Sequence, residues 1–160
     1  MSRVDTSLIG PDLVFMDVWA CDARELFAWL EPVYLDRGLV REGWLEAICA
    51  REEAYPTGLT FDSVAVAIPH VEPEHIASPY ISVIRPRGTV RFGGMGGMPE
   101  VDAQLVVNLG LQAHEEDQVL VVQALMGVFA RREAVEEIMS ATTREDVAAT
   151  MRRWCQECSA

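Results

Sequence analysis

The sequence predicts an α/β fold, a single-domain sandwich in which a mixed β-sheet is flanked by helices. Its length of 160 residues, half of them apolar, suits one domain with one real core, so residues 1–160 are expected to fold together. Short β-branched segments and segments of helical period are mixed throughout the chain. The chain also carries no internal repeat, low-complexity block or obvious linker.

The first third of the chain predicts a strand followed by two helices. Residues 12–18 (DLVFMDV) are typical of a strand, and residues 22–38 have apolar side chains at helical spacing and end at Gly38. Pro32 lies inside this second segment and is expected to kink or break it. Residues 41–54 form the next predicted helix, which Pro56 and Gly58 terminate.

The middle third predicts the remaining strands. Residues 63–68 (SVAVAI) and 79–86 (PYISVIRP) are short and β-branched, and turn residues bound them. Residues 89–92 (TVRF) are expected to pair with 79–86 as a hairpin across Arg87 and Gly88. Residues 103–111 (AQLVVNLGL) form a continuous apolar run, which is the pattern of a buried central strand.

The last third predicts three helices. Residues 115–130 are apolar nearly all round, which indicates a helix buried against the sheet. Residues 132–141 and 143–158 are amphipathic. Thr143, with Asp146 three residues later, has the pattern of a helix N-cap.

The charge composition excludes some classes of partner. Twenty-five acidic residues face 13 cations, all of them arginine, for a formal net charge of −12. This acidity argues against nucleic acid and against an anionic membrane surface as partners. No apolar run reaches the length of about 18 residues that a membrane span needs. Residues 1–13 lack the apolar core of a signal peptide, so we expect a cytoplasmic protein with no direct membrane insertion.

The four cysteines predict neither a cofactor nor a metal. Cys155 and Cys158 have the C-x-x-C spacing, but they lie at the end of a predicted helix, whereas a redox motif opens a helix after a strand. In a reducing compartment we expect free thiols.

His70 is the main candidate for chemistry. A histidine that closes a buried strand is often only a hydrogen-bonded core residue, so its surroundings decide the interpretation. Pro69 fixes the backbone before it, and strand ends are where sites form in α/β sheets. Arg51, in the preceding helix, offers a fork of donors that matches phosphate, although alone it could simply pair with nearby acids. Thr57 adds a hydroxyl, and Gly58 lets the backbone approach an anion.

These motifs carry a family resemblance. The segments REEAYPTGL (51–59) and VAVAIPHVEPEHI (64–76) resemble the active-site region of the fructose/mannitol-type enzyme IIA domains of the bacterial sugar phosphotransferase system. The galactitol-type subgroup is the closer match, because the YPTGL and AIPH motifs, a second histidine five residues later and the RP dipeptide at 85–86 all occur in it.

The resemblance implies a phosphorelay without cofactor or metal. The phosphocarrier protein HPr would phosphorylate His70, and His70 would pass the group to a cysteine of a cognate enzyme IIB, which serves a membrane-embedded enzyme IIC during uptake of galactitol or a related polyol. Arg51 would stabilise the transition state. Mannitol-type members carry a second active-site histidine at a place that falls here on Gln118, which suits the galactitol type. The Gln118 amide would bind phosphate by donating a hydrogen bond, although it cannot carry a proton. His75 and His114 are auxiliary candidates, although each has the polar context of a surface residue.

Two alternatives remain open. The same histidine would serve a regulatory enzyme IIA domain of the nitrogen-related type, which acts through phosphorylation-dependent protein binding. A metal-assisted hydrolase using His70 and His75 would lack a third ligand. For docking, we expect Arg51, Arg85 and Arg87 to supply local positive charge, with an apolar fringe of Leu59, Phe61 and Ile76.

Overall fold

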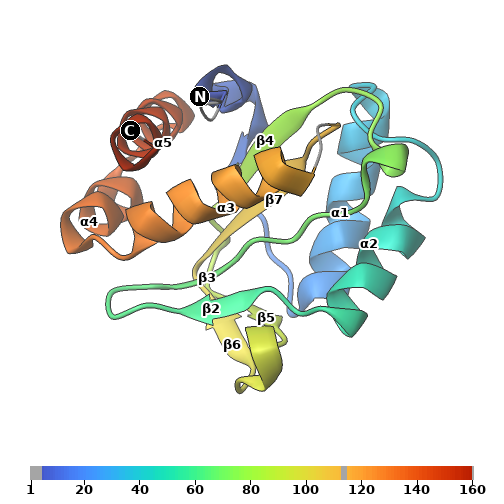
Figure 1. The fold of residues 1–160 in the computed structure, drawn as a ribbon, viewed down its shortest axis with the longest axis horizontal. Coiled ribbons are helices and arrows are strands. Elements are labelled where there is room, and N and C mark those ends of the chain that lie inside the picture. The colour runs from blue at the N-terminus through green and yellow to red at the C-terminus, as the bar shows by residue number, and fades with distance from the viewer. Residues whose placement is uncertain (1–4, 113–114, 160) are drawn as a thin grey trace.

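The computed structural model describes residues 5–112 and 115–159. His114, which the sequence makes an auxiliary candidate, lies outside the described residues. In the described part of the chain, one short strand is followed by two helices, then by six further strands, and last by three helices (Figure 1). The strands are β1 (Val14–Phe15), β2 (Gly58–Thr60), β3 (Ala65–Ala67), β4 (Tyr80–Ile84), β5 (Val90–Phe92), β6 (Val101–Ala103) and β7 (Leu105–Gly110). The helices are α1 (Ala23–Asp36), α2 (Trp44–Ala54), α3 (Glu115–Phe129), α4 (Arg132–Ser140) and α5 (Arg144–Cys158).

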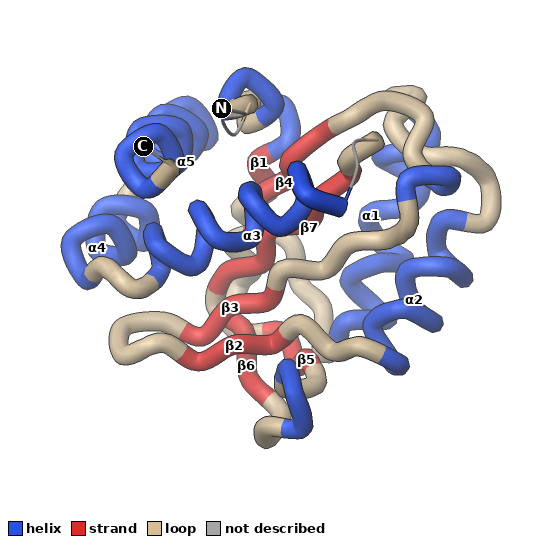
Figure 2. Tube along the Cα trace, in the orientation of Figure 1, coloured by secondary structure: helices blue, strands red, loops and turns tan. Residues whose placement is uncertain are grey.

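The main sheet is mixed, in the order β1-β4-β7-β3-β2. The pairs β1–β4 and β3–β7 are parallel, whereas β4–β7 and β2–β3 are antiparallel. The buried run at 105–110 is therefore the central strand, as its apolar sequence predicts, and it lies next to β3, which leads into His70. Figure 2 shows these strands crossing the middle of the molecule between two groups of helices.

Helices cover both faces of the sheet. The side chains of β7 alternate, so that Leu105, Val107 and Leu109 pack in a cluster with α3, α4 and α5. Val106 faces the opposite way, into a cluster with residues of α1 and α2. The predicted class, a mixed sheet flanked by helices, is therefore confirmed.

The predicted hairpin between 79–86 and 89–92 is wrong. Residues Val90–Phe92 pair antiparallel with Val101–Ala103 in a separate two-stranded sheet. After β4 the chain instead continues beside the segment that follows β1, because the N–H of Arg85 donates to Phe15 O at 2.8 Å and that of Arg87 to Val18 O at 2.8 Å. In the main sheet β4 lies between β1 and β7, so it has no free edge at which β5 could pair.

Two local predictions at helices have different outcomes. Pro32 lies inside α1 without breaking it, since the helix runs on to Asp36 and is anchored by buried residues on both sides of the proline. Thr143 does cap α5, because its Oγ1 accepts a hydrogen bond from the backbone N–H of Asp146 at 3.1 Å. None of the described helices combines the length and the apolar character needed to cross a bilayer.

Candidate functional site

His70 lies at the end of β3, where the sequence predicts it. Its backbone forms a parallel bridge with Leu109 of the central strand, and the Leu109 N–H donates to Pro69 O at 3.1 Å. The imidazole is half-buried, and its Nδ1 lies 3.0 Å from the carbonyl oxygen of Ile68. The strand end therefore holds both the backbone and the ring of His70.

The Ile68 contact fixes the protonation of the ring. A carbonyl oxygen can only accept, so Nδ1 carries the proton and Nε2 keeps its lone pair. Burial, more than any other effect, lowers the pKa of His70, and the Arg51 charge lowers it further, while the Ile68 carbonyl and Glu72 act in the opposite direction. At neutral pH the imidazole is therefore neutral, with a free nucleophilic nitrogen.

Arg51 lies in the last turn of α2, where its charge also suits the negative end of the helix dipole. Its Nη1 is 2.6 Å from Oε1 of Glu72, and its guanidinium carbon is 5.1 Å from the centroid of the Tyr55 ring. The side chain is one-third exposed. The guanidinium is thus held at the surface by a carboxylate and an aromatic ring, with other N–H donors left over for an anion.

A hollow of about 400 Å³ brings three of the predicted residues together. It is lined by Arg51 from α2, by His70, and by Gln118, Val119, Val122 and Gln123 from α3. An anion-sized opening beside a neutral imidazole, a permanent cation and two amides matches the chemistry of a phosphoryl group. The two valines give one wall an apolar character that suits contact with a protein surface.

Thr57 and Gly58, predicted to bind phosphate, are not among the residues that line this hollow. Thr57 is buried, and both its N–H and its hydroxyl donate to Oε1 of Glu52, at 2.7 and 2.9 Å. A Cβ at Gly58 would lie 2.5 Å from the carbonyl oxygen of Gly93. The structure thus gives both residues packing roles, and phosphate binding by them stays a prediction.

Glu52, the residue after Arg51, is a buried carboxylate whose role the sequence does not predict. Burial raises its pKa to about 7, although the backbone and side-chain hydrogen bonds from Thr57 and the Arg51 charge act to lower it. It lines a second hollow, of about 410 Å³, with Cys49, Arg91 and Gly93 among others. Thr57 of the Pro-Thr-Gly turn is therefore a hydrogen-bond donor to this carboxylate.

The other predicted residues lie away from this hollow. His75 is half-buried in a short 3-10 turn, and its Nε2 is 3.7 Å from Oε1 of Glu74. The expectation that Ile76 lies in an exposed docking patch is wrong. Its side chain is fully buried and belongs to the core cluster with residues of α1 and α2. Arg85 is also committed elsewhere, since its Nη1 donates to the carbonyl oxygens of Ile138 and Met139 in α4.

Two residues near His70 are not predicted from the sequence. Glu72, the partner of Arg51, follows His70 by two positions, and an acid so close to a candidate phosphate ligand is a signal in the sequence. Asn108 donates through Nδ2 to Pro69 O at 3.0 Å, and it was hidden inside an apolar run. Only the pairing of β7 with β3 shows where it points.

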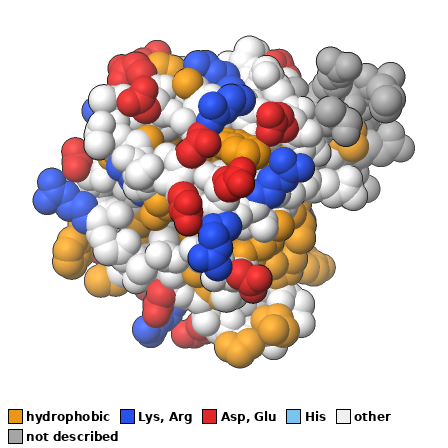
Figure 3. All heavy atoms as spheres, turned by 90° about the vertical axis from the view of Figure 1, so that its left-hand side faces the viewer, with side chains coloured by type: hydrophobic (Ala, Val, Ile, Leu, Met, Phe, Trp, Pro, Cys, Tyr) orange, Lys and Arg blue, Asp and Glu red, His pale blue; other side chains and the backbone are white. Residues whose placement is uncertain are grey.

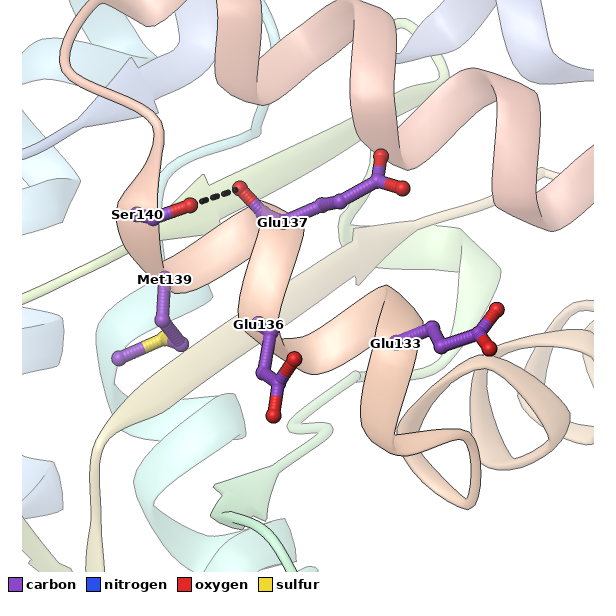
Figure 4. A pocket seen from close by; sticks show the side chains of 5 residues that line it. All are labelled: Glu133, Glu136, Glu137, Met139 and Ser140. Atoms are coloured by element: carbon purple, nitrogen blue, oxygen red, sulfur yellow. Dashed lines mark hydrogen bonds between the residues drawn. The ribbon is translucent and has the colours of Figure 1, made fainter.

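A larger hollow, of about 620 Å³, lies on α4 and is poorly suited to an anion. Figure 4 shows three glutamates of one short helix projecting around it, and its lining comprises Glu133, Glu136, Glu137, Met139 and Ser140. Negative charge there would repel a phosphoryl group. On the neighbouring surface, acidic and arginine side chains are intermixed without one large basic area (Figure 3). Among the described residues, no three His, Cys, Asp or Glu side chains are grouped so that they could hold a metal ion.

Comparison with known proteins gives consistent results. The family model described as "Phosphoenolpyruvate-dependent sugar phosphotransferase system, EIIA 2" matches residues 7–154. A galactitol-specific EIIA component of Escherichia coli K12 is 29% identical over 119 residues, which are 74% of this chain and 79% of that protein.

Two solved structures share the fold. The nitrogen regulatory protein IIA-Ntr of Neisseria meningitidis has a TM-score of 0.75 at 22% identity, and the match covers 91% of this chain and 97% of the other. The mannitol enzyme IIA of Escherichia coli, solved in complex with its phosphorylated enzyme IIB, has a TM-score of 0.70 at 20% identity, with 89% and 95% covered.

Proposed function

The chain belongs to the EIIA 2 family of the phosphoenolpyruvate-dependent sugar phosphotransferase system, and we propose that His70 is the residue on which it carries the phosphoryl group. Proteins of this family are phosphotransferases that work through a phosphohistidine. The observation that carries the proposal is the hydrogen bond from Nδ1 of His70 to the Ile68 carbonyl, in a ring that lines the same hollow as Arg51.

The chemistry at His70 needs no separate base. The Nε2 lone pair attacks the phosphorus of the phosphorylated donor, an N–P bond forms, and the bond between phosphorus and the donor breaks. His70 already carries its proton on Nδ1, so the imidazole becomes a phosphorylated cation with that proton still donated to Ile68 O. Onward transfer reverses these steps toward the acceptor, and no proton has to leave His70 in either direction.

Arg51 supplies the charge that this transfer needs. In a loose transition state, negative charge lies on the three equatorial oxygens of the phosphoryl group, and a guanidinium is the side chain best matched to them. In the structure Arg51 is paired with Glu72 through a single nitrogen, Nη1. Its remaining N–H groups, with the Gln118 amide in the same hollow, can receive the phosphoryl oxygens.

We propose HPr as the donor and a cysteine of a cognate enzyme IIB as the acceptor. The solved complex of the mannitol relative with phosphorylated enzyme IIB supports an enzyme IIB partner for this fold. Val119, which lines the hollow, and Tyr55, whose ring lies against Arg51, are both exposed. Two exposed apolar side chains suit the small interface of a partner that binds and then dissociates.

For the transported substrate we propose galactitol or a related polyol. The support is the relationship to the galactitol-specific component of Escherichia coli, at 29% identity over three-quarters of the chain. The nitrogen regulatory relative favours a second possibility, in which the same phosphohistidine controls binding to another protein. That relative is less similar in sequence, at 22% identity, and its likeness concerns the fold.

The test is phosphorylation from phosphoenolpyruvate with the general enzyme I and HPr, followed by intact mass measured at neutral pH. We expect an acid-labile gain of one phosphoryl group, which is lost in His70→Ala and kept in the matched variants His75→Ala and His114→Ala. Arg51→Lys keeps the charge but loses the fork of donors, so transfer is expected to slow while the fold stays intact. Phosphorylation of His70→Ala at the wild-type level would refute the assignment.

A further inference from the structure

We infer that Asn108 and Tyr80 are positioning residues for His70: together they fix the peptide group that carries the nucleophile. The inference rests on the proposed function of His70 and extends it to two buried side chains on different strands. Neither residue touches the hollow, so both act through the backbone of Pro69 and His70.

The carbonyl oxygen of Pro69 is held by two donors at once. The backbone N–H of Leu109 donates to it at 3.1 Å, and Nδ2 of Asn108 donates to it at 3.0 Å. A carbonyl oxygen has two lone pairs, and both are used here. Because the peptide unit is planar, fixing the direction of this carbonyl also fixes the N and Cα of His70.

Tyr80 fixes which end of the Asn108 amide faces Pro69. Its hydroxyl donates to Oδ1 of Asn108 at 2.8 Å. Pro69 O can only accept, so Nδ2 must face it, and the hydroxyl then holds the other end of the amide. Asn108 is fully buried and Tyr80 is 1% exposed, so water cannot replace either contact. Burial raises the pKa of Tyr80, so its hydroxyl stays protonated and remains a donor.

Gly110 leaves room for the ring of Tyr80. Tyr80 pairs with Gly110 across β4 and β7, and a Cβ at Gly110 would lie 2.0 Å from the Tyr80 ring. The ring can therefore lie over β7 only because residue 110 is glycine. Tyr80 also packs against Tyr34, with ring centroids 4.8 Å apart. The close approach to Gly110 and the contact with Tyr34 leave the Tyr80 hydroxyl little freedom.

The consequence for the nucleophile is its tautomer. The bond from Nδ1 of His70 to Ile68 O closes only when the backbone between these residues keeps its conformation. If the Pro69 carbonyl turns, that bond is lost, and the proton of the neutral ring can move to Nε2, which then has no lone pair for attack. Asn108 and Tyr80 thus keep Nε2 of His70 unprotonated without touching the ring themselves.

The experiment compares Tyr80→Phe with Tyr34→Phe in the full chain. Each substitution removes one buried hydroxyl from the same aromatic cluster, but the Tyr34 hydroxyl has no hydrogen-bond partner among the described residues. Asn108→Leu serves as a third variant, although it places a branched chain in a filled site, so the single-atom change at Tyr80 carries the test. The measurements are the ¹⁵N chemical shifts of the His70 ring before phosphorylation, and the rate of phosphorylation from phospho-HPr.

We expect the wild type and Tyr34→Phe to show Nδ1–H and a free Nε2, and Tyr80→Phe to show a mixture of tautomers. The phosphorylation rate of Tyr80→Phe should fall by about threefold to tenfold, the loss expected for one buried hydrogen bond. If Tyr80→Phe and Asn108→Leu keep the wild-type tautomer, the positioning role is overturned while the phosphorylation of His70 stands. If the wild type is not phosphorylated at all, the proposed function fails, but the tautomer shifts still decide the positioning role.

Discussion

The pair between Arg51 and Glu72 predicts how strongly this protein holds its phosphoryl group. In the structure Glu72 occupies one nitrogen of the guanidinium at 2.6 Å. A hydrogen bond from its own backbone N–H, and in addition the one from Arg51, lower the pKa of Glu72, so it is charged at neutral pH. A phosphoryl group on His70 must therefore share Arg51 with a carboxylate, and this competition weakens the interaction of Arg51 with the phosphoryl group. The change Glu72→Gln removes that competition.

The size of the effect follows from the exposure of the pair. The two side chains are 32% and 48% exposed, so the pair is a surface ion pair worth about 0.2–1 kcal/mol. Glu72→Gln should therefore raise the equilibrium ratio of phosphorylated to free protein by about 1.4-fold to fivefold at a fixed ratio of phospho-HPr to HPr. Higher salt should shrink the difference.

The assay is intact mass at neutral pH after the protein and HPr have exchanged phosphate to equilibrium. An equilibrium measurement is independent of how fast the partners dock. The matched control is Glu74→Gln, which removes an acid from the same loop that pairs weakly with His75 at 3.7 Å instead of with Arg51. An equilibrium ratio in Glu72→Gln no higher than in Glu74→Gln would refute the competition.

Three further predictions concern pH and packing. The buried Glu52 has a pKa of about 7 in the folded protein and an ordinary value in the unfolded chain. The free energy of unfolding, measured by urea titration, should therefore fall by about 3 kcal/mol between pH 4.5 and 7.5 in the wild type and not in Glu52→Gln. Parallel pH profiles of the two proteins would contradict this. Because burial and the Arg51 charge lower the pKa of His70, Arg51→Gln should raise that pKa in an NMR titration. An unchanged or lower value would exclude this electrostatic effect of Arg51. In Gly58→Ala the new Cβ would clash with Gly93 and Val101, so the melting temperature should fall while the folded protein still accepts phosphate. Loss of phosphorylation at full stability would instead support phosphate binding by Gly58.

The elements that carry the site could be predicted from the sequence because their signals are local. The apolar run before Pro69, the helix that ends near Arg51 and the continuous apolar run of β7 each follow from residues close in the chain. The position of Gln118 beside His70 followed from the family resemblance, and the structure brings both to one hollow.

What could not be predicted depends on contacts between distant segments. β5 pairs with β6 and not with β4, because β1 and β7 already pair with β4 on its two sides, which no local turn signal reveals. The role of Thr57 depends on Glu52, a carboxylate whose burial is set by the packing of α2 against the rest of the fold. Asn108 acts on Pro69 across two strands, and its position in an apolar run gives no sign of that.

Phosphorylation of His70 on Nε2 is tested most directly by ³¹P and ¹⁵N NMR on the phosphorylated protein with ¹⁵N-labelled histidine. We expect one phosphorus, coupled to Nε2 of His70, with the proton on Nδ1 still donated to the Ile68 carbonyl. A phosphorus coupled to Nδ1 of His70, or to either nitrogen of another histidine, would contradict it.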